Sequence, residues 1–281
     1  MSQEKFYKMT STKNKFIEIV KEHSYFLDSV GWGKLQKEVS SIKEVNLKTI
    51  NNLLKRVDKH SFAVGKLSKK GKINLPPKIF TKEYLGDIGL LKLPGFFTLD
   101  DNQYSKNYRD IVRSLKKLGS KKKLVIDLSE NTGGNMYPWL AALSPLYDTE
   151  CVGYFEYKYK DTKDKWLISK DGVYCGNKKW FEKINSDKFS FEKIAILLSP
   201  QTSSSGEAIA MSFIGQNNVK TFGQKTAGFT TGNEDYDMGG ITIWLSTCMM
   251  EDREQRNYPN GIKPDSVTKD SLKESIKWLD S

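Results

Sequence analysis

The chain of 281 residues (32.1 kDa) is long enough to bury a substantial core, in one large domain or two moderate ones. No apolar run approaches the ~18 residues of a membrane-spanning helix, and two histidines with three scattered cysteines match neither a zinc site nor a disulfide framework. The formal net charge of +11 comes mostly from dispersed lysines without a nucleic-acid-binding motif, so we expect no metal, no cofactor and no nucleic-acid partner.

The N-terminal stretch MSQEKFYKMTSTKNKF lacks the apolar core of a secretory signal. We therefore expect the chain as given to be cytoplasmic, without stable membrane insertion. The alternative is that it is the mature part of an exported or cell-surface protein. No pattern in the sequence indicates an oligomeric state.

Residues 1–57 are predicted to form a helical lobe, because apolar side chains recur at spacings of three and four along two stretches. Gly31-Trp32-Gly33 separates these stretches as a turn. His23 lies on the apolar face of the first helix, where a lone histidine more often packs than reacts. The lobe therefore indicates structure rather than chemistry.

The helical period ends at the segment DKHSF, residues 58–62, and a strand is predicted from Phe62 onward. His60 therefore lies at a junction, from which a rigid scaffold can aim a side chain into a cleft. Unlike His23, His60 does not lie on the apolar face of a predicted helix, so packing alone does not explain its presence. His60 is accordingly the better functional candidate of the two histidines.

A buried strand, a glycine turn and a helix follow one another in residues 123–145. LVIDL is a short apolar strand, the glycines of NTGG allow close backbone approach, and a helix begins at Met136. Neither a G-x-G-x-x-G fingerprint nor a Gly-Lys-Ser/Thr loop is present, which excludes the usual dinucleotide and triphosphate loops. Upstream, residues 86–97 predict a buried strand and residues 104–118 an amphipathic helix.

A second strand, turn and helix spans residues 194–214, with three serines at the start of the apolar helix. The partial positive charge and free N–H groups of a helix N-terminus suit a nucleophile and a developing oxyanion. The segment SSGE also matches a capping box, in which Glu207 reaches back to the cap. Taken alone, a segment of this kind more often caps a helix than carries a catalytic nucleophile.

The remaining segments complete an α/β pattern. Strands are predicted at residues 219–222 and 241–245, with a loop rich in Gly and Thr at residues 223–233, and a turn at residues 260–265 precedes a C-terminal helix. Aromatic and lysine alternation in residues 154–173 predicts an exposed antiparallel ribbon. Two strand-turn-helix units indicate an α/β core with a crevice at the carboxyl ends of the strands.

Five segments in the same order resemble the tail-specific (carboxyl-terminal processing) serine protease family: DKHSF (58–62), IDLSENTGG (126–134), TSSSGEA (202–208), GQKTAG (223–228) and NGIKPD (260–265). Each motif alone is weak, but five in order are specific. Within the family, GGNMYPWLAALSP and GFTTGNE resemble the nisin-resistance-type proteases. The resemblance implies a crotonase-like spiral core over residues 58–281, joined to the helical lobe of residues 1–57. The interval between His60 and LVIDL is too short for a PDZ domain as well as the predicted strand and helix, so we infer none.

The resemblance assigns site residues by position in the motifs. Ser204, three positions before the glutamate, corresponds to the nucleophile, and His60 of DKHSF corresponds to the general base. The backbone N–H groups of Gly133 or Gly134 and of Ser205 would form the oxyanion hole. The chemistry is coherent, because a serine hydroxyl is a weak nucleophile until a base with a pKa near 6.5 takes its proton.

Two residues depart from the family pattern. Phe229 stands where the lysine-using branch has its base, which excludes a Ser/Lys dyad. Ser129 replaces the usual arginine, and we expect this change to loosen the glycine turn and lower activity. The third group that would orient the histidine is left open between Glu207 and Glu234, either of which has a plain structural alternative as a helix cap or a solvated side chain.

Together these features predict a serine endopeptidase that cleaves peptide or protein-tail substrates near their C-terminal tail, with an antimicrobial peptide as one candidate substrate. A cationic substrate would be repelled by the +11 body and would require an acidic cleft, for which Glu234, Asp235 and Asp237 are candidates. Two alternatives remain: a catalytically weak peptide-binding or immunity protein on the same fold, and an acyl-CoA enzyme of the crotonase superfamily.

Overall fold

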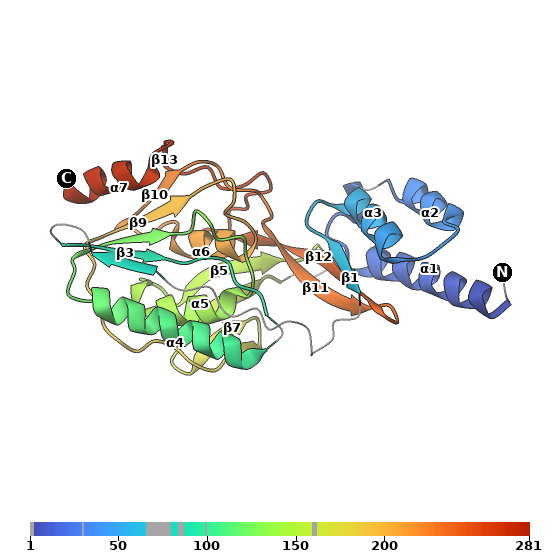
Figure 1. Cartoon of the computed structure of the whole chain (residues 1–281), viewed down its shortest axis with the longest axis horizontal. Helices are drawn as coiled ribbons and strands as arrows, with labels where there is room; N and C mark the ends of the chain where they lie inside the picture. Colours follow the sequence, from blue (N-terminus) through green and yellow to red (C-terminus); the bar gives the residue numbers. More distant parts are fainter. Residues whose placement is uncertain (1–2, 30, 66–79, 84–86, 99, 159–161) are drawn as a thin grey trace. The chain divides into compact units, whose positions relative to one another are not determined.

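The computed structural model of the chain describes residues 3–29, 31–65, 80–83, 87–98, 100–158 and 162–281, and the side chains of these residues except 3–10, 29 and 80–83. The chain divides into two compact units, and most of their helices and strands are labelled in Figure 1. The first unit comprises Met1–Gly71, Tyr157–Asp161 and Thr231–Met249, and the second comprises Lys72–Glu156, Thr162–Thr230 and Met250–Ser281. None of the helices in the described ranges is long and apolar enough to cross a membrane.

The first unit combines helices with a small antiparallel sheet. Strand β12 pairs with β1 along one edge and with β11 along the other. These strands belong to the same compact unit as the helices. The elements are α1 (Gln3–His23), a 3-10 turn (Leu27–Ser29), α2 (Trp32–Ser41), α3 (Leu47–Val57), β1 (Phe62–Gly65), β11 (Thr231–Asp237) and β12 (Ile241–Glu251), whose last two residues lie in the second unit.

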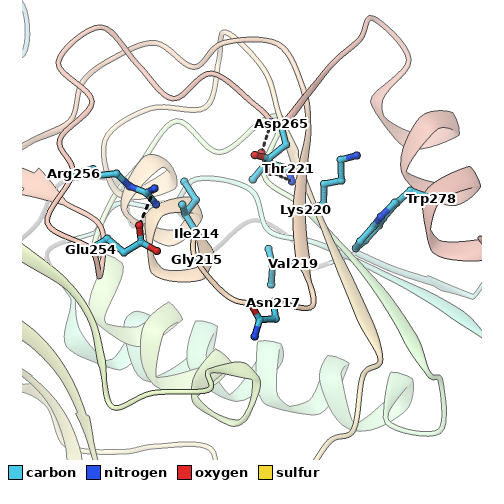
Figure 2. Close-up of a pocket in the computed structure, with 10 residues that line it drawn as sticks. All are labelled: Ile214, Gly215, Asn217, Val219, Lys220, Thr221, Glu254, Arg256, Asp265 and Trp278. Atoms are coloured by element: carbon cyan, nitrogen blue, oxygen red, sulfur yellow. Dashed lines mark hydrogen bonds and ion pairs between the residues drawn. The ribbon is translucent and has the colours of Figure 1, made fainter.

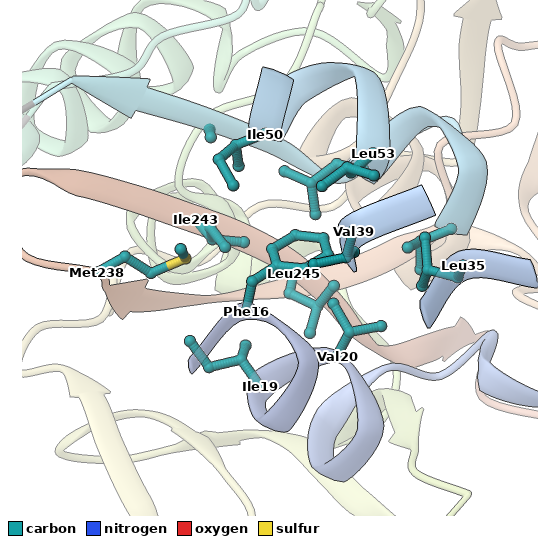
Figure 3. Packing of buried hydrophobic residues seen from close by; sticks show 13 residues of the cluster. Phe16, Ile19, Val20, Leu35, Val39, Ile50, Leu53, Met238, Ile243 and Leu245 are labelled. Carbon is teal, nitrogen blue, oxygen red and sulfur yellow. The ribbon is translucent and has the colours of Figure 1, made fainter. Parts of the chain in front are cut away.

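Helix α3 starts at a reciprocal cap. The Asn46 side chain accepts a hydrogen bond from the Thr49 N–H (3.0 Å), and the Thr49 hydroxyl accepts one from the Asn46 N–H (2.9 Å), so two otherwise orphaned donors are satisfied. The apolar stripe of the helix packs into a cluster that also takes side chains from α1, α2 and β12, as Figure 3 shows. This cluster contains Phe16, Ile19, Val20, Leu35, Val39, Ile50, Leu53, Leu54, Val57, Ala63, Met238, Ile243 and Leu245.

The second unit is built on a mostly parallel sheet with the strand order β13-β10-β9-β4-β3-β2. Strands β3, β4, β9, β10 and β13 run parallel, and β2 is an antiparallel edge. The central strands KLVID and KIAILL each have an apolar, buried interior, as expected where both faces of a sheet are covered. The strands are β2 (Phe80–Glu83), β3 (Ile88–Lys92), β4 (Lys123–Asp127), β9 (Lys193–Leu198), β10 (Val219–Gly223) and β13 (Ser266–Val267).

Helices cover this sheet on two sides (Figure 1). Helix α7 (Ser271–Asp280) contacts β9 and β10 and buries Leu279 completely. Helix α4 (Asp101–Leu118) contacts β2 and β3, and packs against α5 (Met136–Leu143), which in turn contacts α6 (Ser205–Phe213). Every residue of α6, and all but one of α5, is buried, which explains why both helices are rich in apolar residues; the polar side chains of α6 are Ser205, Glu207 and Ser212.

An antiparallel meander completes the second unit: β5 (Cys151–Glu156), β6 (Asp164–Ser169), β7 (Gly172–Cys175) and β8 (Lys178–Phe181). The sequence predicted this segment to be an exposed ribbon, but Trp166 is completely buried. A Cβ atom at Gly153 would stand 2.4 Å from the Trp166 ring, so this glycine makes room for the indole on the neighbouring strand. One face of the ribbon therefore belongs to the core.

The α/β class and the helical N-terminal region expected from the sequence are confirmed. The predicted loop at residues 223–233 ends earlier than expected, because β11 begins at Thr231. Trp32 begins helix α2 rather than sitting inside a turn. Gly86, the first residue of the strand predicted at 86–97, lies outside the described residues.

Truncation of a fully buried side chain in the first unit should cost more than the same truncation at its surface. We expect Leu54→Ala, which empties a site with 0% exposure, to lower the free energy of unfolding by about 2–5 kcal/mol. Leu47→Ala in the same helix, at 39% exposure, is the matched control and should cost less than about 0.5 kcal/mol. The change in the free energy of unfolding of each variant is measured by urea denaturation that is monitored through hydrogen exchange of the α3 amides. Equal losses in the two variants would contradict the packing described.

Candidate active site

Parallel pairing of β4 and β9 brings two turns to the same edge of the sheet. Asp127 and Leu197 are partners in register, so the loops that follow these strands leave the sheet side by side. Hydrogen bonds join the two loops: the Thr202 hydroxyl donates to the Leu128 carbonyl (2.9 Å), and the Ser199 hydroxyl donates to the Ser129 carbonyl. The glycine turn and the serine cluster are therefore neighbours, as the α/β pattern predicted.

Ser204 stands at the start of α6 in a rare backbone conformation. Its φ of 53° and ψ of −121° are values that non-glycine residues seldom adopt and that cost about 1–3 kcal/mol. The neighbouring Ser203 and Ser205 are 8% and 6% exposed, whereas Ser204 is only partly buried. Of the three serines, Ser204 is thus the one presented to solvent at the end of a helix.

The Glu207 carboxylate fixes this turn from inside the protein. One oxygen accepts from the backbone N–H groups of Ser204 (3.0 Å) and Phe229 (2.8 Å), and the other accepts from the Gly228 N–H (2.8 Å) and the Thr226 hydroxyl. Complete burial raises the pKa of Glu207, and the four hydrogen bonds oppose that rise. Glu207 therefore caps the helix and also clamps the loop of residues 226–229 to it.

Asn131, which is completely buried, ties the glycine turn in the same way. Its side chain donates to the Leu93 carbonyl (3.0 Å) and accepts from the Gly133 N–H (3.0 Å), while its own carbonyl accepts from the Ser203 N–H (2.9 Å). A Cβ at Gly206 would stand 2.5 Å from the Asn131 carbonyl oxygen, so that glycine permits the contact. Ser129 was expected to loosen this turn, but the ties run through residue 131 instead.

The glycine turn lies directly against Ser204. A Cβ built on Gly133 would stand 2.8 Å from Cβ and 3.3 Å from Oγ of Ser204. The Gly133 N–H is already bonded to Asn131, whereas the N–H groups of Gly134 and Ser205 have no acceptor among the described residues. The Ser205 hydroxyl donates to the Gly134 carbonyl (2.6 Å), which holds these two residues together. Of the three predicted oxyanion donors, Gly134 and Ser205 therefore keep an available N–H.

His60 lies in the first unit, within a network of short polar side chains. Asp58 accepts from the backbone N–H groups of His60 and Ser61, both at 2.7 Å, which sets the turn that carries the ring. The Nδ1 atom of His60 is 2.6 Å from the Thr231 hydroxyl, and the Thr231 hydroxyl is 3.1 Å from the Ser246 hydroxyl. The sequence did not predict this network.

Burial lowers the pKa of His60 to about 4, because desolvation outweighs the opposing effect of the Asp58 charge, and Lys59 lowers it slightly further. The imidazole is consequently neutral at physiological pH. A neutral imidazole has one nitrogen free to accept a proton, as a general base requires.

The acidic residues considered for the site lie on β11. Glu234, Asp235 and Asp237 are exposed, and the Tyr236 hydroxyl donates to Glu234 (2.9 Å). Asn233 bonds the His60 carbonyl (3.2 Å), and successive strand residues point to opposite faces, so Glu234 points away from that contact. Within the first unit, the side-chain contact described for the His60 ring is the one to Thr231, and Glu234 bonds Tyr236 instead.

A cavity of about 460 Å³ also opens in the second unit, between β10, α7 and the segment of residues 254–265 (Figure 2). Three of its charged groups are paired within the protein: Asp265 accepts from the Thr221 N–H and hydroxyl, and Arg256 pairs with Glu254 as well as with Asp252. None of the predicted site residues lines it. Among the described residues, no group of three or more His, Cys, Asp or Glu side chains is placed to hold a metal ion.

Sequence reasoning proposed Ser204, the glycine turn and His60 as site residues but did not identify the residues that hold them in place. Asn131 had one available signal, a small polar residue directly before Thr-Gly-Gly. Ser246 had another, a serine in the mostly apolar run ITIWLSTCMM, whose other hydroxyl residues are Thr242 and Thr247. Asp58 stood inside the DKHSF motif but carried no assigned role.

Comparison with known proteins agrees with these features. The profile described as peptidase family S41 matches residues 87–268. A nisin-resistance protein of Lactococcus lactis subsp. lactis is 30% identical over 273 residues, covering 92% of this chain and 83% of that protein. A lipoprotein structure from Streptococcus agalactiae superposes with a TM-score of 0.80 and 26% identity, covering 96% and 95% of the two chains. A Parabacteroides merdae structure, with TM-score 0.63, 14% identity and 97% coverage of both chains, shares the fold.

Removal of one acceptor from the Glu207 clamp should destabilise the second unit. Glu207→Gln keeps the shape but places an amide N–H₂ against backbone donors, so we expect a loss of about 2–3 kcal/mol in the free energy of unfolding. Glu274→Gln, on the exposed face of α7, is the control and should cost less than about 0.5 kcal/mol. Urea midpoints compare the two, and an unchanged midpoint for Glu207→Gln would contradict the clamp.

Proposed function

The chain belongs to peptidase family S41, and on that basis we propose that it is a serine endopeptidase in which Ser204 is the nucleophile and His60 the general base. The family resemblance expected from five short motifs is thereby confirmed. The observation that carries the proposal is the strained Ser204 turn beside Gly134 and Ser205, whose N–H groups have no acceptor among the described residues. Strain at a helix start next to unused donors is a feature of functional sites.

The proposed chemistry is acyl transfer. Ser204 Oγ attacks the carbonyl carbon of the scissile peptide while its proton passes to Nε2 of His60, and the Gly134 and Ser205 N–H groups bind the resulting oxyanion. His60 then gives that proton to the leaving amine as the C–N bond breaks. Water attacks the acyl-enzyme, transferring its proton through His60 back to Ser204 Oγ, which releases the acid and restores the enzyme.

The proposed substrate is a peptide or protein tail, cleaved near its C-terminus. The relative from Lactococcus lactis is named for resistance to nisin, and we extend this to propose that the present chain degrades a peptide of that kind. Exposed Glu234, Asp235 and Asp237 would attract a cationic substrate that the net charge of +11 otherwise repels.

The alternative of a catalytically weak binding or immunity protein was motivated by Ser129 in place of an arginine. The buried ties of Asn131 give the glycine turn a support that does not depend on residue 129, which favours the enzyme. Binding of an intact peptide without turnover, unchanged in Ser204→Ala, would favour the immunity protein. A bound acyl-CoA would favour the crotonase-type enzyme.

Substitution of either predicted catalytic residue should abolish turnover. We expect Ser204→Ala and His60→Ala each to lower kcat by about 10³-fold or more, and the double variant to be no slower than the singles, because the two residues act as a unit. Ser203→Ala, one position away and outside the proposed machinery, is the matched control. Mass spectrometry of peptide products and labelling of Ser204 by a fluorophosphonate provide two readouts, and equal activity in all variants would overturn the assignment.

The pH dependence should report the buried histidine. Protonated His60 cannot accept the Ser204 proton, so activity is lost as pH falls through the pKa of about 4 rather than through the ordinary value of 6.5. The rate of fluorophosphonate labelling between pH 3 and 8 measures this limb without a titrating substrate. A midpoint near 6.5 would show that the ring is solvated in the working enzyme.

A further inference from the structure

We propose that Thr231 and Ser246 form a hydroxyl relay that connects the Asp58 carboxylate to His60 and holds the imidazole in the tautomer protonated at Nδ1. This inference deepens the proposed function and rests on it for its catalytic meaning. It supplies the orienting group of the histidine, which the sequence left open between Glu207 and Glu234. All four residues lie in the first unit.

The relay is a continuous path of short contacts. Asp58 Oδ1 is 3.0 Å from the Ser246 hydroxyl, which is 3.1 Å from the Thr231 hydroxyl, which is 2.6 Å from His60 Nδ1. Ser246 is completely buried and Thr231 is 5% exposed. Buried hydroxyl groups require hydrogen-bond partners within the protein, so the positions of their protons are restricted.

Counting protons gives the direction of each bond. The Ser61 hydroxyl donates to the other Asp58 oxygen, and Ser61 Oγ accepts from the Ser246 N–H (2.9 Å). The single Ser246 proton has three possible acceptors, Asp58 Oδ1 at 3.0 Å, Thr231 Oγ1 at 3.1 Å and Asn233 Oδ1 at 3.2 Å, and the charged Asp58 oxygen is the strongest and nearest of them. Two hydroxyls remain near Ser246 Oγ, those of Ser61 at 3.4 Å and Thr231 at 3.1 Å. The Ser61 proton is already given to Asp58, so Ser246 Oγ receives its proton from Thr231.

The Thr231 proton, once given to Ser246, is no longer available to the histidine. The contact of 2.6 Å between Thr231 Oγ1 and His60 Nδ1 then requires a proton on Nδ1. If Nδ1 were unprotonated instead, one of the three contacts would place two lone pairs against each other. Only the Nδ1–H tautomer provides one proton for every link from His60 to Asp58.

This tautomer leaves Nε2 as the basic nitrogen of the ring. In a serine triad a carboxylate bonded directly to Nδ1 fixes the tautomer and stabilises the imidazolium that forms during catalysis. Here two hydroxyls stand between the carboxylate and the ring and transmit the same polarity. Thr231 and Ser246 are therefore positioning residues, which act on the substrate only through His60.

The pairing of β11 with β12 explains how the relay is assembled. Asn233 is in register with Ser246, and the register shifts between Gly232 and Asn233, which is a β-bulge. A bulge re-aims side chains, and here both Thr231 and Asn233 contact the Ser246 hydroxyl. The relay therefore explains why a serine occurs in the apolar run of β12.

The decisive experiment observes the tautomer directly. The full chain is labelled with ring-¹⁵N histidine, and His23→Gln leaves His60 as its single imidazole. At pH 7 we expect the proton on Nδ1 and an unprotonated Nε2 in the ¹⁵N spectrum, and Thr231→Val should shift the population toward the Nε2–H form. A proton found on Nε2 in the protein with Thr231 intact would overturn the relay.

Activity supplies the second readout, with conservative rescue. Thr231→Val, which removes the hydroxyl but keeps the shape, should lower kcat about 10-fold or more with KM within about 2-fold, and Thr231→Ser should recover most of the loss. Thr242→Val removes a hydroxyl from a half-buried position on the same strand pair and is the matched control. An unchanged kcat in Thr231→Val would contradict the relay.

The two readouts separate failure of the relay from failure of the proposed function. A protonated Nδ1 in a protein without any Ser204-dependent peptidase activity would support the relay and reject the serine peptidase. Activity that depends on Ser204 and His60, together with a protonated Nε2, would support the peptidase and reject the relay.

Discussion

The four hydrogen bonds of the buried Glu207 carboxylate are the interaction on which the Ser204 turn of the second unit depends. They join the start of α6 to the loop of residues 226–229, two chain segments that no secondary structure would otherwise hold together. The rare conformation of Ser204 costs about 1–3 kcal/mol. Hydrogen bonds to a charged acceptor contribute about 1.5–3 kcal/mol each, so four of them offset that strain and part of the cost of burying the charge.

The same solution recurs wherever this molecule presents a reactive group. Asn131 holds the glycine turn and Asp58 holds the turn that carries His60, each through short side-chain bonds to backbone N–H or carbonyl groups. A short side chain has few rotamers, so little conformational entropy opposes these bonds. The reactive groups are thus positioned by buried polar ties, while the apolar clusters supply the stability that permits them.

The features that could be predicted from the sequence are those determined by residues close together in the chain. The strands at residues 124–128 and 194–198 follow from apolar runs, and the turns after them from adjacent glycines and small hydroxyl residues. The capping box predicted the bond from Glu207 to Ser204 but not those to Gly228 and Phe229, because these depend on how the loop returns. The network around His60 could not be predicted from local patterns, because Asp58 and Ser246 stand 188 positions apart. They meet where β1 pairs with β12, and Thr231 reaches Ser246 through the pairing of β11 with β12.

The composition of the first unit from three separated chain segments bears on how such proteins can be recombined. The N-terminal helices cover Ile243 and Leu245 of β12, which the chain reaches only after most of the second unit has been made. Deletion of the N-terminal helices would not remove the first unit as a whole, because β11 and β12 come later in the chain. The shortened chain would expose the apolar face of β12 as an aggregation-prone surface. Helices and returning strands must therefore be inherited together, and diversity is expected to accumulate in surface loops rather than by exchange of the lobe.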